Sequence, residues 1–573
     1  MTKKIIKRRA KPDDSISYGL HPLLQRIYAA RGIQSEKELE RGLEFLLPYH
    51  SLLNIQAAVE LLAYAVIEQK NILIVGDFDA DGATSSALSV RALKSFGANA
   101  PHYLVPNRFE FGYGLTPELV DVAKQFNPYL IVTVDNGIAN HAGVVAAKEA
   151  GIKVLITDHH LPAETLPPAD AIVNPNQAGD VFQSKHMAGV GVIFYVMLAL
   201  RRYLSEQQWF LKKNIPEPNM ARLLDLVALG TIADVVSLDH NNRILVHQGL
   251  QRIRLGQCVA GIIALCEISK KNPAKITAAD LGFSIAPRLN AAGRLDDMSL
   301  GIECLLSDDL VAARQMANTL NQLNDERRVI EQDMQEQALH ALKKIKTDKE
   351  DHGYGICLFD ETWHQGVIGI IASRIKDRLH RPVIAFAVSN ETELKGSARS
   401  IAGLHIRDVL AEINVQYPNL IHKFGGHAMA AGLTLLRASL HDFMRVFNDI
   451  VAEKLKSIDL QQVLLSDGEL HPEELSLEVA DILQAAGPFG QAFPEPLFDG
   501  IFQLLEQRLV GGRHLKMTLG KDKHLIPAIA FNIDLNQWPN YRCDAINIAY
   551  RIDINEFRGK RSVQLIVEHM ETA

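Results

Sequence analysis

Three short runs of β-branched and other apolar residues in the N-terminal half of the chain each end in acidic residues. They are NILIVGDFDADG at 71–82, LIVTVDNG at 130–137 and KVLITDHH at 153–160. Segments with helical spacing, 83–97 and 140–151, follow the first two runs. Strands that alternate with helices predict an α/β fold with a doubly wound parallel sheet, in which ligands bind outside the carboxyl ends of the strands. The acidic residues are therefore expected to meet at that edge.

The rest of the chain predicts several further parts. A length of 573 residues suggests three or four domains. A polar stretch at about 308–347 has no Gly or Pro and predicts one long connector helix. A second, smaller α/β pattern begins at Tyr354, and alternating apolar and polar residues near the C-terminus predict a β-domain. The predicted boundaries are an N-terminal arm at 1–45, a catalytic domain at 46–307, the connector at 308–350, the second α/β domain at 351–456 and the β-domain at 457–573.

Side chains suited to a hard metal ion gather at the predicted strand ends and in one later segment. They are Asp77, Asp79, Asp81, Asp135, Asp158, His159, His160 and Asp234. Carboxylates combined with imidazole favour Mn²⁺ or Mg²⁺ over zinc. Asp234 is a lone acid in the apolar segment LVALGTIADVVSL, where an unpaired carboxylate would be costly, so a partner or a metal is expected. One Asp-Gly after a strand is usually only a turn, but three such clusters at one edge indicate a metal site.

The triplet Asp158-His159-His160, together with the Asp-x-Asp cluster at 77–82, resembles the signature of the DHH phosphoesterase superfamily. Within it, the segments VPNRFEFGYGL, MAGVGV, GTIADVVSL and APRLNAAGRLDD are similar to the RecJ family. WHQGVIGIIASRI, KGSARS and FGGHAMAAG resemble the second domain of that family, of the DHHA1 type. The terminal β-domain is similar to an oligonucleotide-binding (OB) fold.

The resemblance implies two divalent cations, Mn²⁺ or Mg²⁺. One would be held by Asp79 and Asp135, with Asp77 close by in a position that the sequence does not define. The other would be held by a set that shares one residue with the first: Asp81, Asp135, His159 and Asp234. Asp135 would thus bridge the two ions. His160 would face the scissile phosphate, and Asp158 would orient a neighbouring ligand.

Several residues in turns rich in glycine or alanine are candidates for binding phosphate, since guanidinium matches phosphate bidentately. They are Arg108, Arg288, Arg294, Ser397, Arg399, Gly425, Gly426 and His427. By resemblance, the 5′ end of the substrate would be held by Arg108, Arg294, Ser397 and Arg399. The Gly-Gly pair would let backbone amides approach phosphate, with His427 as a donor. Arg288, between a proline and a leucine, could instead be structural.

Aromatic residues of the β-domain could stack on bases. They are Phe531, Trp538, Tyr541, Tyr550 and Phe557. Aromatic residues on strands are nevertheless core residues more often than not, so no base-binding residue is assigned there.

The resemblance implies a 5′→3′ exonuclease that hydrolyses single-stranded DNA to 5′-mononucleotides in DNA repair and recombination. One alternative is a DHH-type phosphoesterase of dinucleotides or small nucleotides, which would need neither the connector nor the β-domain. Another is a replication scaffold without metals, which the intact acidic residues oppose. Single-strand-binding protein and a helicase are partners by resemblance only, and a monomer is expected.

Composition predicts the compartment. Five scattered cysteines form no Cys-x-x-Cys pair, the basic N-terminus lacks an apolar signal region, and no apolar run is long enough to span a membrane. A cytoplasmic protein without a membrane partner is expected. The net charge of −7 counts mildly against nucleic-acid binding. Acidic metal ligands lower the net charge, however, and a local basic patch suffices for binding DNA.

Overall fold

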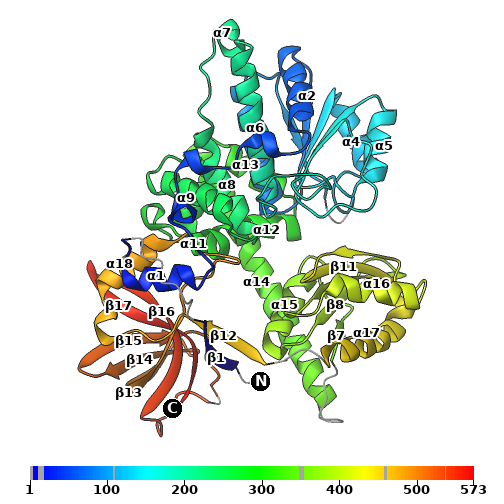
Figure 1. Cartoon of the computed structure of the whole chain (residues 1–573). Coiled ribbons are helices and arrows are strands. Elements are labelled where there is room, and N and C mark those ends of the chain that lie inside the picture. The colour runs from blue at the N-terminus through cyan, green and yellow to red at the C-terminus, as the bar shows by residue number, and fades with distance from the viewer. Residues whose placement is uncertain (1–3, 11–18, 108–109, 347–353, 457–460, 536) are drawn as a thin grey trace. The chain divides into compact units, whose positions relative to one another are not determined.

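A parallel sheet in the N-terminal half of the computed structural model carries the acidic clusters (Figure 1). Its strand order is β3-β2-β4-β5-β6, and all neighbouring strands are parallel. The strands are β2 (Ile72–Val75), β3 (His102–Leu104), β4 (Leu130–Val134), β5 (Lys153–Thr157) and β6 (Ala171–Val173). Because β3 and β4 lie on opposite sides of β2, the strand order reverses between β2 and β4. In open α/β sheets, ligands bind at the carboxyl ends next to this switch point, so the predicted fold is confirmed.

Helices cover both faces of this sheet. One face packs against α4 (Pro117–Ala123) and α5 (His141–Glu149), around a buried apolar cluster. The other face packs against α3 (Ala80–Ser95) and α6 (Gly189–Glu206). Successive side chains of each strand point to opposite faces of the sheet. Because both faces are covered, every residue of β2 and β4 is buried and the strands are continuous apolar runs.

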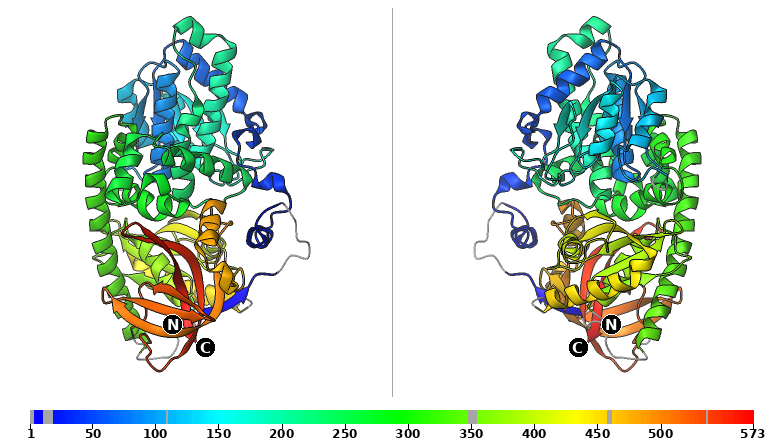
Figure 2. Two further views of the ribbon diagram at one scale, coloured as in Figure 1. Left: turned by 90° about the vertical axis from the view of Figure 1, so that its left-hand side faces the viewer. Right: turned by 90° about the vertical axis from the view of Figure 1, so that its right-hand side faces the viewer.

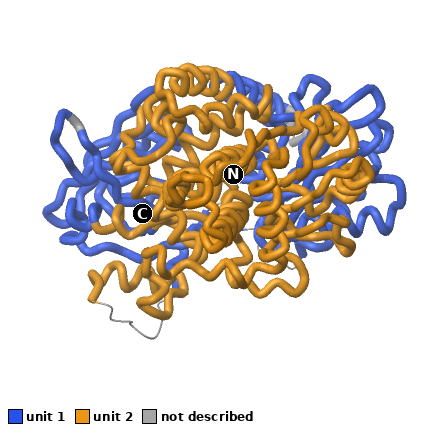
Figure 3. The backbone as a smooth tube through the Cα atoms, turned by 90° about the horizontal axis from the view of Figure 1, so that it is seen from above, with its two compact units in different colours: residues 1–10, 325–481, 496–573 blue, residues 11–324, 482–495 orange. Residues whose placement is uncertain are grey.

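The chain divides into two compact units, each described here by itself (Figure 3). One unit contains the parallel sheet and comprises residues 11–324 and 482–495. The other comprises residues 1–10, 325–481 and 496–573. The structure describes residues 4–10, 19–107, 110–346, 354–456, 461–535 and 537–573.

Helices complete the unit that contains the parallel sheet. They include α1 (Pro22–Ala29), α2 (Ile55–Ile67), α8 (Leu224–Ala233), α9 (His240–Arg254) and α12 (Ala286–Leu295). The predicted connector is one helix, α14 (Leu310–Lys346), which appears as a continuous green helix in Figure 2. The division between the units falls within this helix, after Asn324. No single described helix is long and apolar enough to cross a membrane. Residues 43–51 and 55–67 have that length and composition only when taken together, as a pair bent by 90°.

The second unit contains a mixed sheet of order β10-β11-β9-β8-β7. Its strands are β7 (Ile356–Phe359), β8 (Val383–Val388), β9 (Glu393–Arg399), β10 (Lys423–Gly426) and β11 (Ala430–Leu436). Helices α16 (Ile406–Gln416) and α17 (Leu440–Leu455) bury one face of the sheet. On the opposite face, α15 (Ile368–Leu379) contacts β8 and β9.

A closed barrel of order β13-β14-β15-β17-β16 forms the predicted OB-like domain. Its strands are β13 (Phe498–Val510), β14 (His514–Lys521), β15 (His524–Ala530), β16 (Ala545–Phe557) and β17 (Lys560–Thr572). Tyr550 and Trp538 are buried in its core, whereas Phe531 and Tyr541 are 52% and 76% exposed. The side chain of Phe557 lies outside the described residues. Only two of the five predicted aromatics are therefore seen to face solvent.

The predicted N-terminal arm is divided between the two units. Strand β1 (Lys4–Arg8) pairs in parallel with β12 (Gln462–Ser466). The Nη2 atom of Arg8 also donates to Asp499 Oδ2 at 2.7 Å, at the start of the barrel. Residues 19–45, including α1, belong to the unit with the parallel sheet. Because the partner strand lies more than 450 positions away, local sequence patterns do not reveal this pairing.

Candidate metal centre

The loop after β2 delivers three carboxylates to the sheet edge. Asp79 is the N-cap of α3, and its Oδ1 accepts hydrogen bonds from the amides of Asp81 at 2.9 Å and Gly82 at 3.0 Å. Asp81 is buried, and its two oxygens accept from the amides of Gly189 at 2.6 Å and Val190 at 2.9 Å, at the start of α6. Both carboxylates are thus bound at helix N-termini, where amides without an intrahelical partner and the helix dipole favour negative charge.

Asp135 follows β4 in the left-handed conformation, with φ of 62°. Asp tolerates this conformation better than most residues do. The next residue, Asn136, donates from its side-chain amide to the carbonyls of Val75 at 3.0 Å and Val134 at 2.9 Å, and so ties the ends of β2 and β4 together. Helix α6 approaches Asp135 so closely that a Cβ on Gly189 would lie 2.5 Å from the Asp135 Cβ. Only glycine leaves room at that position.

Asp158 holds the two histidines that follow it. Its Oδ1 accepts from the amides of His159 at 2.7 Å and His160 at 3.1 Å, and lies 2.7 Å from His160 Nδ1. Burial opposes the charged forms of both Asp158 and His160, but their mutual attraction outweighs it. The pKa of Asp158 falls to about 2 and that of His160 rises to about 9. Asp158 therefore orients the ring of His160 and favours its protonated form.

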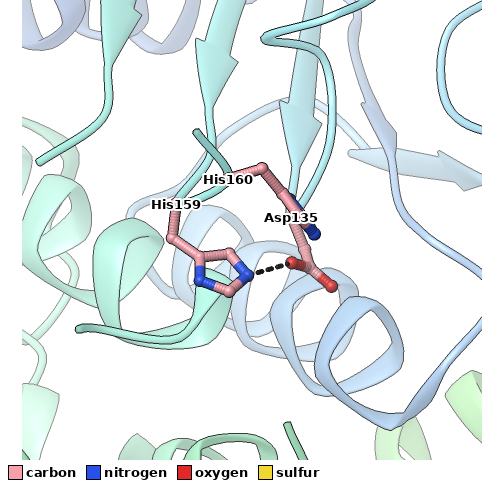
Figure 4. A group of neighbouring side chains, drawn as sticks. All are labelled: Asp135, His159 and His160. Atoms are coloured by element: carbon pink, nitrogen blue, oxygen red, sulfur yellow. Dashed lines mark ion pairs between the residues drawn. The ribbon is translucent and has the colours of Figure 1, made fainter. Parts of the chain in front are cut away.

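The ligand atoms of these residues converge in three overlapping groups, each with all its atoms within 4.8 Å of one another. The groups are Asp77, Asp79 and Asp135; Asp81, His159 and Asp234; and Asp135, His159 and His160. Asp135 belongs to two groups and His159 to two, and Figure 4 shows their side chains directed at each other. The structure thus places all eight predicted residues at one sheet edge and groups Asp77 with Asp79.

The positive charge of His160 does not balance the carboxylates of this cluster. Burial, reinforced by neighbouring carboxylates, raises the pKa of Asp81 and of Asp234 to about 7, and raises that of Asp135 well above its usual value. Burial and the charge of His160 lower the pKa of His159. Several carboxylates so close together cannot all ionise without a compensating cation.

Two buried atoms provide a direct test of whether a metal fits. Asp135 Oδ1 and His159 Nε2 are buried and have no hydrogen-bond partner in the part of the chain that the structure describes. Buried polar atoms are otherwise almost always satisfied. Carboxylate oxygens with one imidazole nitrogen form the donor set that suits Mn²⁺ or Mg²⁺. The residues present therefore fit divalent metal ions.

Tyr113 is a site residue that the sequence reasoning missed. Its hydroxyl donates to the Asp135 carbonyl at 3.2 Å and lies 3.4 Å from His160 Nδ1. Its ring meets those of Phe78 and His160 edge-on. The tyrosine lies in the FGYGL segment, where flanking glycines marked a turn but gave no indication that the turn reaches the sheet edge.

Helix α12 contacts the loop after β2 through two further residues that were not predicted. Asn290 accepts at Oδ1 from the amide of Ala80 at 2.8 Å. A Cβ on Gly293 would lie 1.7 Å from the Phe78 carbonyl oxygen, so the helix and the loop are in direct contact. Arg294, a predicted phosphate ligand, is the next residue of this helix.

The other predicted arginines of this unit differ from one another. Arg288 is 8% exposed and donates to Asn321 Oδ1 at 3.0 Å and to the Ser284 carbonyl at 2.5 Å. These contacts join α12 to α14 and agree with the structural alternative for Arg288. Arg108 lies outside the described residues.

The remaining predicted phosphate ligands lie on one sheet of the other unit. Ser397 of β9 is paired with Gly432 of β11, which is paired with Gly425 of β10. Residues directly opposite each other share a face of a sheet, and a Cβ on either glycine would meet nothing within 4 Å. That part of the face is open. Gly426 follows on β10, and the exposed His427 donates from its amide to the Ala430 carbonyl at 2.8 Å.

Arg399 is held beside Ser397 on β9. Its Nη1 donates to Ser397 Oγ at 3.0 Å and to the Ala398 carbonyl at 2.8 Å, and burial lowers the pKa of the guanidinium. Gly369, in the first turn of α15, lies against both side chains, since a Cβ there would be 2.9 Å from Arg399 Nη2 and 3.0 Å from Ser397 Oγ. A partly buried guanidinium, a hydroxyl and a helix start together can bind an anion.

The barrel carries a groove of about 670 Å³ on its surface. A bulge between Leu504 and Glu506 in β13 turns Leu505 outward, and that side chain is 51% exposed. Leu505 lines the groove together with the exposed Tyr541, Arg508 and Lys516. An aromatic ring beside two cations suits a base and its phosphates.

Three family models match the chain in succession. The DHH family N-terminal domain matches residues 71–231, the DHHA1 domain matches 352–453, and the RecJ OB domain matches 466–569. These ranges include the parallel sheet, the mixed sheet and the barrel.

Characterised relatives match over nearly the whole length. The chain is 54% identical to the single-stranded-DNA-specific exonuclease RecJ of Dickeya dadantii, over 99% of this chain and 98% of the relative. It is 53% identical to that of Escherichia coli, over 100% of both. Among solved structures, RecJ of Thermus thermophilus in complex with Mn²⁺ is 30% identical, with a TM-score of 0.79, and the match covers 97% of this chain and 76% of that one. A Mg²⁺ complex from the same organism matches with a TM-score of 0.74.

Proposed function

The chain belongs to the RecJ family of DHH phosphoesterases, and from that premise we propose a 5′→3′ exonuclease that uses two divalent cations to degrade single-stranded DNA. Like the other members of the family, it is a hydrolase that acts as an exonuclease specific for single-stranded DNA. The observation that supports the cations best is the shared position of Asp135 in two groups of ligand atoms, with an Oδ1 that is buried and unsatisfied among the described residues.

The first proposed ligand set is one of these groups, and the second joins Asp135 to the group of Asp81, His159 and Asp234, because Asp135 Oδ1 lies 3.1 Å from His159 Nε2. Asp77, Asp79 and Asp135 would hold one cation. The second would be held by Asp81, Asp135, His159 and Asp234, which makes Asp135 the bridge. Bound there, Mn²⁺ or Mg²⁺ would lower the pKa of a water molecule and stabilise negative charge on the phosphate oxygens.

The residues around the cations would position the phosphate. The Asp158 carboxylate raises the pKa of His160 to about 9, and the protonated ring can donate a hydrogen bond to a phosphate oxygen. Asp158 holds its ring through Nδ1, and Tyr113 lies against it. The oxygen of water joins the phosphorus, the bond from phosphorus to the 3′ oxygen of the terminal nucleotide breaks, and that oxygen takes up a proton. A 5′-mononucleotide leaves, and the shortened strand keeps a 5′-phosphate.

The proposed polarity rests on the resemblance, which assigns Arg294, Ser397 and Arg399 to the 5′ end of the strand. Within their own unit, Ser397 and Arg399 lie together on the open sheet face, where Arg399 Nη1 donates to Ser397 Oγ. A group that binds the terminal phosphate determines which diester is hydrolysed. Arg108 retains its proposed role by resemblance, whereas Arg288 is assigned a structural role.

The alternative of a dinucleotide phosphoesterase is not favoured, because the match to RecJ relatives continues through the OB domain. Roles in DNA repair and recombination, action as a monomer, and association with single-strand-binding protein and a helicase are proposals that rest on family membership. The predicted domain boundaries at 307/308, 350/351 and 456/457 are likewise proposals.

Product analysis tests the proposed function. A long single strand labelled separately at each end is digested with Mn²⁺, with Mg²⁺ and with EDTA. We expect mononucleotides, early loss of the 5′ label and no reaction in EDTA. Loss of the 3′ label first would overturn the polarity, and unchanged digestion in EDTA would overturn the role of the metals.

A further inference from the structure

A segment late in the chain belongs to the compact unit of the metal cluster. Residues 482–495 lie in that unit, although residues on either side of them belong to the other one. Their central part, GPFGQAFP at 487–494, is named here the clamp segment. It ends four residues before β13, the first strand of the barrel.

The clamp segment contacts the chain on both sides of Asp234. The amide of Leu238, four residues after Asp234, donates to the Gln491 carbonyl at 2.9 Å. A Cβ on Gly490 would lie 2.8 Å from Leu238 Cδ1 and 3.9 Å from Cδ1 of Ile232, two residues before Asp234. The backbone at Gly490 therefore packs directly against the segment that presents this carboxylate.

The clamp segment is itself held by buried aromatic and cationic groups. Phe493 is 3% exposed, stacks with Tyr28 at 6.2 Å between ring centroids, and lies 4.4 Å below the guanidinium of Arg243. Arg243 also donates from Nη1 to the Leu238 carbonyl at 3.0 Å, and from Nη2 to the Glu38 carbonyl at 2.8 Å. One arginine thus joins the clamp segment to Leu238.

The segment after Asp234 has a conformation that needs external support. Asp234 is the C-cap of α8, and Val235 follows it with φ of 59° and an exposed side chain. A β-branched residue is strained in the left-handed region, and such strain persists only where the surrounding structure enforces it. The contacts that Leu238 makes with Gln491 and Arg243 restrain the chain on the C-terminal side of Val235.

We propose that the clamp segment is a positioning element of the metal centre: through Leu238 and Ile232 it holds the Asp234 carboxylate in place to bind metal. The metal centre then depends on residues some 250 positions beyond its ligands. This inference rests on the proposed function in one respect, the assignment of Asp234 as a ligand. It assigns no catalytic role to the clamp segment, which acts only through Asp234.

Binding of Mn²⁺ to the full-length protein without DNA tests the inference, measured by titration calorimetry and by the electron paramagnetic resonance of free Mn²⁺. The main variant is Gly490→Ala, whose methyl would lie closer to Leu238 than the about 3.5–4.0 Å at which carbon atoms pack. The matched control is Ala492→Asn, an exposed position of the same segment with φ of 59°, where asparagine is tolerated. Asp234→Ala tests the ligand assignment itself.

We expect Gly490→Ala to weaken one Mn²⁺ site about 10-fold, as changes beside a metal ligand commonly do, and Ala492→Asn to leave it unchanged. In exonuclease assays, kcat at limiting Mn²⁺ falls, KM for DNA stays the same, and excess Mn²⁺ restores kcat. If Asp234→Ala weakens Mn²⁺ binding but Gly490→Ala does not, the clamp inference is wrong and the proposed function stands. If Asp234→Ala has no effect on Mn²⁺ binding, the ligand assignment is wrong, and the inference fails with it.

Gly490→Ala could also unfold the unit, so thermal unfolding is recorded for each variant. Arg243→Lys is the second variant, because it adds no volume and can reach only one of the two carbonyls that Arg243 binds. We expect the same selective loss of Mn²⁺ affinity. A folded Arg243→Lys protein with unchanged affinity would overturn the inference independently of Gly490.

Discussion

His159 Nε2 lies 3.1 Å from Asp135 Oδ1, and neither atom forms a hydrogen bond with any described residue. The two side chains come from the ends of adjacent strands, β5 and β4, and meet at the sheet edge. His159 Nε2 is also 3.5 Å from Asp234 Oδ2. Atoms that could bind a cation thus face one another, and Asp135 Oδ1 and His159 Nε2 have no hydrogen-bond partner among the described residues.

Asp135→Ala should abolish turnover with either Mn²⁺ or Mg²⁺, because it removes the residue shared by both proposed ligand sets. Binding of a single strand, measured by fluorescence anisotropy, should remain largely intact. Asp170→Ala is the control, since it also removes one carboxylate from the same sheet, where Asp170 pairs with Lys153 at 2.8 Å. A near-native rate for Asp135→Ala would show that the bridging role is wrong.

Mn²⁺ affinity should fall as the pH drops below about 7. Asp81 and Asp234 have pKa values raised to about 7, so in the metal-free protein they bind protons below that pH. A cation must displace these protons. Calorimetry in buffers of different ionisation heats should therefore find more protons released per ion at pH 6 than at pH 8. An equal release at both pH values would contradict the raised pKa values.

The same two groups should make the metal-free protein less stable as the pH rises. Their folded pKa values lie above the ordinary value of 3.8, so the folded state binds more protons than the unfolded state between about 4 and about 7. This contribution to stability is present at low pH and is lost as the pH rises through that window. The difference in thermal midpoint between Asp234→Asn and the parent protein in EDTA should therefore grow from pH 5 to pH 7.5. Saturating Mn²⁺ should reduce or reverse it, because the parent protein binds the ion more tightly than the variant.

Tyr113→Phe should lower kcat about 3- to 10-fold with little change in KM, since one hydrogen bond contributes about 0.5–1.5 kcal/mol. The lost hydroxyl holds the Asp135 carbonyl at 3.2 Å and touches the ring of His160. Tyr103→Phe is the matched control, because its hydroxyl donates to Glu303 instead. A rise in KM alone would instead mean that Tyr113 binds the substrate.

Arg399→Ala should raise KM, lower kcat or both, and most strongly on strands with a 5′-phosphate. The guanidinium is partly buried beside Ser397, where a terminal phosphate would replace the hydration that it has lost. Arg381→Ala is the control in the same unit, because Arg381 donates to the carbonyl of its neighbour His380. Equal losses of kcat/KM on 5′-phosphorylated and 5′-hydroxyl strands would show that Arg399 does not bind the terminal phosphate.

Deletion of residues 496–573 should weaken affinity for long single strands much more than for dinucleotides, and should flatten the dependence on salt. Each stacked base contributes about 1–3 kcal/mol, and phosphate contacts make binding salt-dependent. Anisotropy with oligonucleotides of increasing length measures both effects. Unchanged affinity and salt dependence would indicate that the barrel docks a protein partner instead.

The position of that cut depends on residues 482–495. All the predicted metal ligands precede residue 240, so the sequence alone predicts that a deletion from about 460 onward leaves the metal centre intact. The structure places residues 482–495 in the unit of the metal cluster. A deletion from 460 onward should therefore weaken Mn²⁺ binding, whereas a deletion from 496 onward should not.

Much of the metal centre could be predicted from sequence because its signals are local. Asp77, Asp135 and Asp158 each end an apolar strand, and parallel strands bring their carboxyl ends to one edge whatever the details of packing. The connector helix was equally predictable, since a long stretch without Gly or Pro leaves few alternatives. Alternating apolar and polar residues near the C-terminus predict the barrel in the same way.

Only the tertiary structure decided what depends on contacts between distant segments. It grouped Asp77 with Asp79, brought Tyr113 to His160, turned Arg288 toward α14, and paired β1 with β12. It also packed Gly490 against Leu238. The sequence by itself determines strand ends, helix lengths and residue chemistry, because these follow from backbone preferences and the periodicity of apolar residues. Which side chains meet depends on how whole elements pack, and close packing is a property of the assembled chain rather than of any one segment.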